Sequence, residues 1–175
     1  MKKYELTAET KVNFLGKTLF RIKALVSFGN VEAGELGGYI EKEENLSHYG
    51  NAWVSGNARV SGNAEVCGNA RVCGNAEVCG NARVCGNAWV SGNAEVCGDA
   101  DYTTIKGFGS CFRCTTFFRC KDKQVRVSCG CFYGTIPEFR AKVKETHGDT
   151  KIAKEYLMIA DLMDMHFERG KQVTE

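Results

Sequence analysis

The sequence lacks the features that mark membrane-spanning, secreted and nucleic-acid-binding proteins. No apolar run approaches the roughly 20 residues that a membrane-spanning helix needs. The N-terminal stretch MKKYELTAETK has neither the apolar core nor the cleavage site of a signal peptide. The formal net charge of the 175 residues is only +2, so no overall charge favours nucleic acid or a membrane surface. We therefore expect a soluble protein of the cytoplasm.

A six-residue repeat runs without interruption from Gly50 to Thr103, nine times in all. It reads GNAWVS, GNARVS, GNAEVC, GNARVC, GNAEVC, GNARVC, GNAWVS, GNAEVC and GDADYT. The Ala-x-Val core alternates like a half-buried strand, and Gly-Asn supplies the positive φ of a tight corner. Three such sides close a triangular coil of 18 residues, so the repeats predict a β-helix of three turns. Its inward positions are Ala52 to Ala100 and Val54 to Val96, every six residues.

Ten cysteines suggest a disulfide framework, but their placement favours small, reduced side chains. Five of them occupy one slot of the repeat, and serine fills the same slot in three other repeats. A slot that accepts either residue requires a small side chain rather than a crosslink. Because no secretion signal is present, we expect free thiols. This expectation includes the pairs Cys67/Cys85 and Cys79/Cys97, which lie one predicted coil apart.

The pattern Val-Ser/Cys-Gly-Asn-Ala-x resembles that of the hexapeptide-repeat family of left-handed parallel β-helices. The chain is also similar to uncharacterised bacterial and phage proteins that carry a GxLGGxxExExNLS segment before GNAxV repeats. Here that segment runs from Gly34 to Ser47. The resemblance implies a left-handed coil and a phage-type protein, and it implies almost nothing about function.

Residues 1–49 are predicted to form an N-terminal β cap on the solenoid. Thr18–Leu25 alternates in polarity after a turn around Gly16, which indicates a β-hairpin. Ile40 and Leu46 keep the six-residue spacing, so one irregular coil is expected before the regular coils. Such caps are needed because an open solenoid end exposes apolar core and unpaired backbone.

Residues 104–175 are predicted to form a small α+β subdomain. The β-helix, residues 50–103, ends where Tyr102 replaces the inward valine, because a core of alanine and valine has no room for a phenol ring. Thr135 and Glu138 form a capping box that opens a helix. A hairpin and two helices are expected at Thr115–Cys120, Gln124–Phe132, Thr135–His147 and Lys151–Arg169.

Residues 18 apart stack about 4.8 Å from one another on one face of such a solenoid. One predicted face carries Trp53, Arg71 and Trp89 without any acidic residue. An arginine between two tryptophans is typical of an interface, so we expect this face to hold a homotrimer together. A self-contained cation–π stack on a monomer is the alternative.

The segment from Lys106 to Arg126 concentrates positive charge, with six basic residues against the single acid Asp122. Guanidinium groups, hydroxyls and exposed backbone N–H groups are what an anionic ligand requires. The residues expected to bind such a ligand are Ser110, Arg113, Thr115, Thr116, Arg119, Lys121 and Arg126. The alternative is a solvated hairpin whose charges keep an edge strand from aggregating.

Four cysteines of the C-terminal part could supply thiolates to a zinc ion, namely Cys111, Cys114, Cys129 and Cys131. Cys129 and Cys131 share a strand face where small apolar residues would suffice, so we expect core cysteines, no metal and no cofactor. A nucleophilic Cys129 would need a base or a positive field. His147 belongs to the same subdomain, but the sequence does not show whether the two side chains meet.

Many hexapeptide-repeat proteins are acyltransferases, and the resemblance implies a catalytic histidine at a trimer interface and a loop ejected from the coil. This chain has no histidine between Tyr49 and Thr146 and no loop within the repeats, so only His48 lies near the coils. We therefore expect a non-enzymatic binding or scaffold protein, phage-encoded and homotrimeric. It would bind a host protein or sequester an anionic, nucleotide-like ligand, as a counter-defence protein does. A hexapeptide-type acyltransferase is the alternative.

Overall fold

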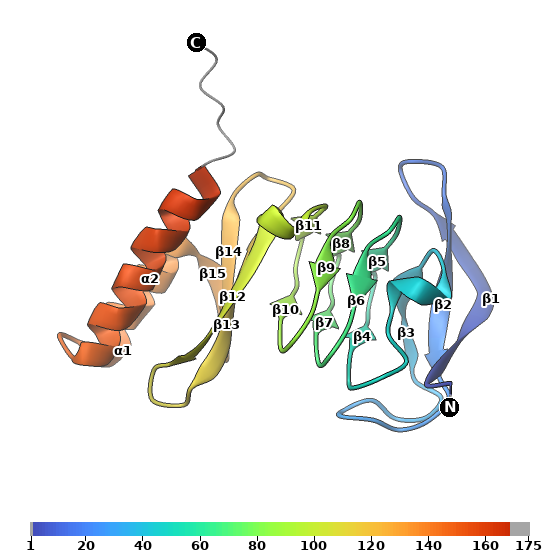
Figure 1. The fold of residues 1–175 in the computed structure, drawn as a ribbon, viewed down its shortest axis with the longest axis horizontal. Helices are drawn as coiled ribbons and strands as arrows, with labels where there is room; N and C mark the ends of the chain where they lie inside the picture. Colours follow the sequence, from blue (N-terminus) through green and yellow to red (C-terminus); the bar gives the residue numbers. More distant parts are fainter. Residues whose placement is uncertain (1, 169–175) are drawn as a thin grey trace, which may run out of the picture. The chain divides into compact units, whose positions relative to one another are not determined.

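The computed structural model describes residues 2–168, and the chain divides into two compact units that meet in sequence between Asp99 and Ala100. The first unit contains the N-terminal cap and a β-solenoid, and the second contains a β-sheet and two helices (Figure 1). The ninth repeat, assigned to the solenoid from the sequence, is thus divided between the two units. Within residues 2–168, no helix is long and apolar enough to cross a membrane.

The N-terminal cap is a β-hairpin extended by a third strand, as far as Ile40. Strands β1 (Tyr4–Val12) and β2 (Thr18–Ala24) pair antiparallel, which confirms the predicted hairpin, and β3 (Leu36–Ile40) pairs antiparallel with β2. The predicted alternation along β2 is not strict, because Leu19 and Ile22 are both buried. A shift of register between β2 and β3 separates these two residues and allows both to point inward.

Eight strands of two residues form the regular part of the solenoid, and each pairs in parallel with a strand of an adjacent coil. The three sides contain β4-β7-β10, β5-β8-β11 and β6-β9. In chain order the strands are Trp53–Val54, Arg59–Val60, Glu65–Val66, Arg71–Val72, Glu77–Val78, Arg83–Val84, Trp89–Val90 and Glu95–Val96. The stacked coils of Figure 1 thus confirm a parallel β-solenoid of about three turns.

The core of the solenoid consists of the predicted alanine and valine columns. Every inward alanine from Ala52 to Ala94 and every inward valine from Val54 to Val96 is buried. The prediction that Ala100 also points inward is wrong, because Ala100 is exposed in the short 3-10 helix η2 (Asp99–Asp101).

The repeat changes at Asp99, which stands where the earlier repeats have asparagine. In earlier coils the N–H of the outward residue donates to the alanine carbonyl of the next coil, as Glu65 donates to Ala82 at 3.0 Å. The N–H of Arg83 donates instead to the Asp99 carboxylate at 2.9 Å. The side chain therefore replaces the backbone carbonyl that would have continued the coil.

An irregular coil precedes the regular ones, as predicted. Ile40 pairs in parallel with Val60, and Leu46 forms a bridge with Val66, so both fall into the valine columns. Between them lies the 3-10 helix η1 (Glu43–Asn45).

Two side chains complete the first edge of the solenoid. The Lys3 ammonium group donates to the carbonyl of Ala52 at 2.8 Å, and the Asn45 amide donates to the carbonyl of Ala64 at 2.7 Å. These carbonyls receive side-chain donors where the carbonyls of later coils receive a backbone N–H. The cap thus satisfies the backbone acceptors that an open edge would leave unpaired.

The corners of the coils combine a left-handed glycine with a stacked asparagine. Gly68 has φ of 67°, and a Cβ atom there would lie 3.0 Å from the backbone nitrogen of Gly86 in the next coil. Only glycine therefore allows the coils to stack this closely. The amide of Asn51 donates to the Asn69 side chain at 3.2 Å, and Asn69 donates to Asn87 at 3.1 Å.

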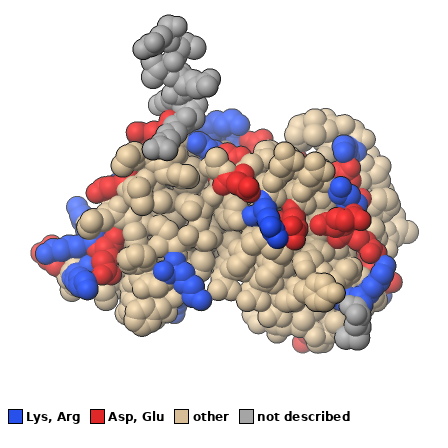
Figure 2. All heavy atoms as spheres, viewed as in Figure 1, with Lys and Arg blue, Asp and Glu red and all other residues tan. Residues whose placement is uncertain are grey.

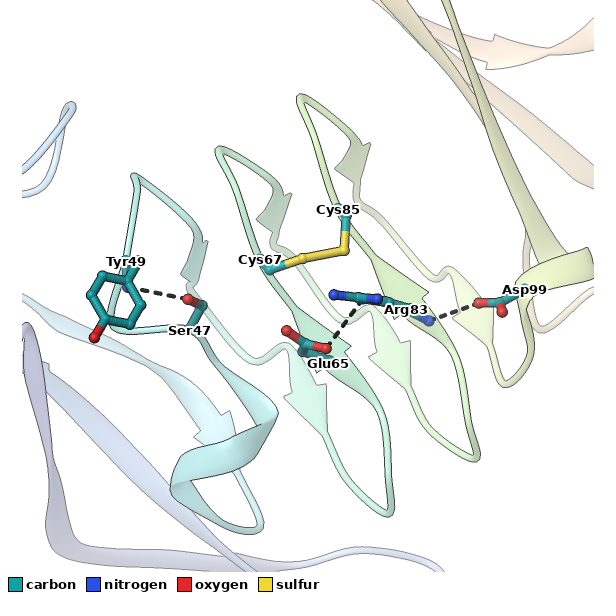
Figure 3. The surroundings of a disulfide bond; sticks show 7 residues. All are labelled: Ser47, Tyr49, Glu65, Cys67, Arg83, Cys85 and Asp99. Atoms are coloured by element: carbon teal, nitrogen blue, oxygen red, sulfur yellow. Dashed lines mark hydrogen bonds and ion pairs between the residues drawn. A yellow bond between two sulfur atoms is a disulfide. The ribbon is translucent and has the colours of Figure 1, made fainter.

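Two disulfides connect adjacent coils, so the prediction of free thiols is wrong at four cysteines. Cys67 is bonded to Cys85 and Cys79 to Cys97, with Cα atoms 4.7 and 4.4 Å apart. Stacking at 18 residues places each pair within the Cα separation that a disulfide requires. Figure 3 shows the Cys67–Cys85 bond beside an ion pair between the same two coils. Cys73 is a free thiol, since both residues 18 positions away are serines.

The second unit contains an antiparallel sheet of four strands in sequence order. These strands are β12 (Tyr102–Phe108), β13 (Arg113–Arg119), β14 (Val125–Cys129) and β15 (Phe132–Thr135). The predicted hairpin is confirmed as β13 and β14. The second strand of this hairpin, β14, is shorter than predicted, because Gly130, with φ of 61°, turns the chain into β15.

Two helices cover one face of this sheet. Helix α1 (Ile136–His147) begins at the predicted capping box, in which Thr135 accepts a hydrogen bond from the N–H of Glu138. Helix α2 spans Lys151–Glu168, and the predicted last residue, Arg169, lies outside the described residues. The residues buried between the sheet and the helices include Phe117, Val127, Phe139, Val143, Ala160 and Met163.

Candidate functional site

Strand alternation divides the predicted ligand-binding residues between two faces of the sheet. Arg113, Thr115 and Arg119 point to the face that the helices cover, whereas Thr116 and Arg126 point to the opposite face. Thr115 is 3% exposed and Thr116 is 1% exposed, so neither hydroxyl is at the surface. The structure therefore does not bring these residues together into one surface.

Two of the predicted arginines are already held by neighbours. Arg119 lies 3.3 Å from the Asp101 carboxylate and donates to the carbonyl of Phe167 at 2.6 Å. Arg126 lies 2.6 Å from the Asp122 carboxylate. Lys121 belongs to the exposed turn that follows β13. On the face of the molecule in Figure 2, basic and acidic side chains are likewise interspersed.

A pocket of about 230 Å³ lies within the second unit, where α1 and α2 meet the ends of β13 and β14. Ser110 and Arg113, both predicted from the sequence, line it together with Cys111 and Cys129. The helices contribute Lys142 and His147 from α1 and Tyr156 from α2, and the apolar lining is Phe132, Phe139 and Val143. The pocket therefore combines an apolar wall with polar and basic groups.

The charged lining of this pocket is basic. Arg113 and Lys142 contribute their positive charges, and no carboxylate belongs to the lining among residues 2–168. Lys142 also contacts the Glu145 carboxylate at 3.0 Å. Arg113 is exposed, and within the described part of the chain no carboxylate forms an ion pair with it. Arg113 is therefore the cation best placed to receive an anion.

Tyr156 supplies a neutral hydroxyl to the pocket. Its hydroxyl donates to the carbonyl of Phe108 at 3.3 Å, and its ring packs edge-on against Phe139 with centroids 5.6 Å apart. Burial, followed by the nearby Cys129 sulfur, raises the pKa of Tyr156 to about 12. The phenol therefore keeps its proton at neutral pH and cannot repel an anionic ligand.

The structure brings Cys129 and His147 to the same pocket, which the sequence could not show. The Thr115 hydroxyl donates to the Cys129 sulfur at 3.1 Å, and the Tyr156 hydroxyl lies near this sulfur. The ring of His147 stacks on the ring of Tyr156 with centroids 6.1 Å apart. Tyr156 thus lies between the thiol and the imidazole.

The four cysteines considered for zinc do not converge. Cys114 and Cys129 lie on opposite faces of the sheet, because Thr115, the neighbour of Cys114, is the residue that pairs with Cys129. Burial raises the pKa of the Cys114 thiol. Within the described residues, no group of three or more histidine, cysteine or acidic side chains is placed to hold a metal ion.

A larger hollow of about 470 Å³ lies along Arg119, β14 and the end of α2. It is less suited to an anion, because its Arg119 is already paired with Asp101 and its lining includes the carboxylates of Asp164 and Glu168. The smaller pocket is therefore the better candidate site.

The tryptophan ladder has the predicted register but not the predicted exposure. Trp53 and Trp89 both pair with Arg71. Trp53 is buried by the cap, with its ring 5.4 Å from Phe28, whereas Trp89 is exposed and donates from Nε1 to the Cys73 sulfur at 3.2 Å. Only Arg71 and Trp89 of the three residues can therefore contact another molecule.

His48, the base that the acyltransferase alternative would use, is part of the cap. Its ring stacks on Tyr4 with centroids 4.3 Å apart, and its Nδ1 accepts the backbone N–H of Lys3 at 3.2 Å. Its Nε2 lies 3.7 Å from the Glu43 carboxylate.

Comparison with known proteins finds similarity in the solenoid. The model of a family described as YdcK beta solenoid repeat matches residues 52–68 and 76–92, both within the regular coils. A search of curated proteins finds no match. The family match supports a β-solenoid repeat, and it does not extend to the second unit, where the pocket lies.

Proposed function

We propose that this protein is a non-enzymatic binding protein whose second unit holds a small anionic ligand in the pocket lined by Arg113, Lys142 and Tyr156. The observation that carries the proposal is the guanidinium of Arg113, which lines the pocket without a carboxylate partner among the described residues. Arginine binds carboxylate and phosphate groups with two parallel hydrogen bonds.

The remaining lining supports a ligand that is anionic at one end and apolar at the other. Phe132, Phe139 and Val143 offer an apolar wall, and the Ser110 hydroxyl adds a polar contact. A pocket of about 230 Å³ is somewhat smaller than the roughly 300 Å³ at which the usual range of ligand sites begins, so a small ligand is expected. These properties suit a nucleoside monophosphate or an aromatic carboxylate.

The solenoid supports a scaffold role rather than a catalytic one. Its coils are joined by backbone ladders, asparagine stacks and two disulfides, so each coil is held on several sides. An acyltransferase has less support, because the histidine it would use, His48, is engaged by Tyr4 and Lys3 within the cap. The proposal rests on the pocket alone. It does not require a phage origin, a host partner or a trimer.

Calorimetry with a charged ligand and its neutral counterpart tests this proposal. Adenosine monophosphate and benzoate are the anionic probes, and adenosine and benzyl alcohol are their neutral counterparts. We expect at least one anion to bind, and its neutral counterpart to bind more weakly. The Arg113→Ala substitution should lower the affinity for the anion by roughly tenfold or more, because a charge-assisted hydrogen bond is lost.

Arg126→Ala is the matched control, because Arg126 lies in the same sheet but on the opposite face and is paired with Asp122. Binding by this variant should equal that of the wild type, and both variants should keep the wild-type melting temperature. Equal binding by Arg113→Ala and the wild type, or no binding of either anion, contradicts the proposal.

A further inference from the structure

Cys129 differs from the other free thiols of the chain in its surroundings. Its sulfur accepts a hydrogen bond from the Thr115 hydroxyl at 3.1 Å, lies near the Tyr156 hydroxyl, and the residue is only partly buried. Thiol–disulfide exchange requires that the reagent can reach the sulfur. The side chain thus lines the pocket and is held in place by one hydroxyl donor.

The pocket around Cys129 is basic, so it favours the approach of anionic reagents over cationic ones. Arg113 and Lys142 line the same pocket, and His147 lies beside Tyr156. Positive charge attracts reagents that carry carboxylates. A thiol reagent that bears carboxylates is therefore attracted to this sulfur, and a cationic reagent is repelled.

The other free cysteines lack this combination. Cys120 is buried, Cys114 points to the opposite face of the sheet, and Cys73 is in contact with Trp89. Cys131 is exposed and does not line the pocket. Cys111 also lines the pocket and is exposed, and the Ser110 hydroxyl lies 3.7 Å from its sulfur, farther than Thr115 lies from Cys129.

We infer that Cys129 is a modification site at which the protein forms a mixed disulfide with a small thiol that carries carboxylates, of the glutathione class. This inference rests on the proposed function, since the same basic pocket binds the anionic part of the reagent. The adduct would occupy the pocket and exclude the anionic ligand, so the oxidation state of cellular thiols would control binding.

The chemistry is a thiol–disulfide exchange with a low-molecular-weight disulfide as the oxidant. The Cys129 thiolate attacks one sulfur of the reagent, a new sulfur–sulfur bond forms and the bond within the reagent breaks. The leaving half departs as a thiolate with the electron pair of the broken bond and takes up the proton that the Cys129 thiol has lost. Cys129 and the retained half end as a disulfide, and the released half is reduced to a thiol.

Two small-molecule disulfide reagents, one with carboxylates and one without, test the inference on the full chain. Glutathione disulfide carries carboxylates, and cystamine carries only ammonium groups. Peptide mapping by mass spectrometry after timed exposure gives the rate at each cysteine. We expect glutathione disulfide to modify Cys129 roughly tenfold or more faster than Cys131 and Cys111, with cystamine showing no such preference for Cys129.

Variants separate the role of charge from that of folding. Cys129→Ser should lose the pocket adduct. Arg113→Ala should lower the rate at which glutathione disulfide modifies Cys129 but not the rate for cystamine. Arg126→Ala should change neither rate. The inference is overturned if Cys111 or Cys131 reacts as fast as Cys129, or if cystamine reacts at Cys129 as fast as glutathione disulfide.

The two proposals fail in different ways. If Arg113→Ala abolishes binding of an anionic probe while Cys129 stays unreactive, the modification site is refuted and the binding function stands. If Cys129 reacts with the expected charge preference while neither adenosine monophosphate nor benzoate binds, the modification site stands and the binding function is refuted.

Discussion

Trp53 and Trp89 pair with the same arginine, Arg71, from the two neighbouring coils, yet Trp53 is 3% exposed and Trp89 is 45% exposed. The difference comes from the N-terminal cap, whose Tyr4 and Phe28 rings pack against Trp53 at 6.4 and 5.4 Å. The first tryptophan is therefore part of the core of its unit, and the second is open to other molecules.

Substitution of the two tryptophans should separate these roles. Trp53→Ser should lower the free energy of unfolding by about 3–5 kcal/mol, because it removes a buried ring from the cap. Trp89→Ser should change it by less than about 1 kcal/mol, as most surface substitutions do. Urea unfolding measures both values, and equal losses would refute this assignment.

Trp89 is also the residue through which we expect self-association. Light scattering should show the trimer predicted from the sequence, and Trp89→Ser should convert it to monomers because an exposed aromatic anchor is lost. Arg59→Ser, on another side of the solenoid, serves as the control. A wild-type protein that is monomeric at micromolar concentration contradicts this expectation.

The coil-to-coil disulfides should contribute measurably to stability. Each bond connects residues 18 apart, and closing a loop of this length stabilises a fold by about 3 kcal/mol through the unfolded state. The double variant Cys67→Ser/Cys85→Ser should lose about this much in urea unfolding, whereas Cys73→Ser should lose little. Complete alkylation of Cys67 and Cys85 without reductant would show that this bond is absent.

Acidification should lower the free energy of unfolding of the first unit, because Glu41 becomes protonated. Its carboxylate accepts hydrogen bonds from the Lys17 ammonium and from the N–H of Gly62, both at 2.7 Å, and these hold the pKa of Glu41 below its usual range. A lowered folded-state pKa gives stability that is present above the unfolded pKa of about 4.3 and is lost as pH falls through the folded value.

The corresponding experiment is urea unfolding from roughly pH 6 down to roughly pH 3, across the carboxylate range. The free energy of unfolding should fall less steeply on acidification in Glu41→Gln than in the wild type. Glu5→Gln, which changes an exposed carboxylate of β1, should follow the wild-type curve. Identical slopes for Glu41→Gln and the wild type would contradict the role of Glu41.

The capping box of α1 gives a prediction for the second unit. Thr135→Ala removes the side chain that accepts the N–H of Glu138 at 3.3 Å, so the unfolding free energy should fall by about 1 kcal/mol. Thr135→Ser keeps the hydroxyl and should keep most of the stability. The helix content in circular dichroism should stay near the wild-type value in both variants. A Thr135→Ser loss as large as that of Thr135→Ala would point to packing rather than capping.

The solenoid could be predicted because every repeat carries the same six-residue pattern. The way in which the solenoid ends could not be predicted. The change from asparagine to Asp99 is visible in the sequence, but the bond from the N–H of Arg83 to that carboxylate depends on the position of the preceding coil. The disulfides were missed for a different reason. The spacing of 18 residues between Cys67 and Cys85 is visible in the sequence, but the serines that fill the same slot and the lack of a secretion signal favoured free thiols.

The pocket could be predicted only in part. The two-residue alternation of a strand already separates Thr115 from Thr116, and this signal was available in the sequence. Arg113 and Ser110 were found through the local concentration of charge. Lys142 and Tyr156 were not, because they reach the pocket from helices whose placement on the sheet depends on tertiary packing.

The uniform stacking of the coils has a consequence for how the gene can change in length. Successive coils are joined by the same asparagine and backbone contacts at a spacing of 18 residues. A duplication of 18 codons would reproduce every contact and lengthen the solenoid by one strand spacing, about 4.8 Å. Only insertions in multiples of six residues keep glycine above glycine and valine above valine, and only multiples of 18 also keep each strand on its own side. Relatives of this protein should therefore differ in length by whole coils.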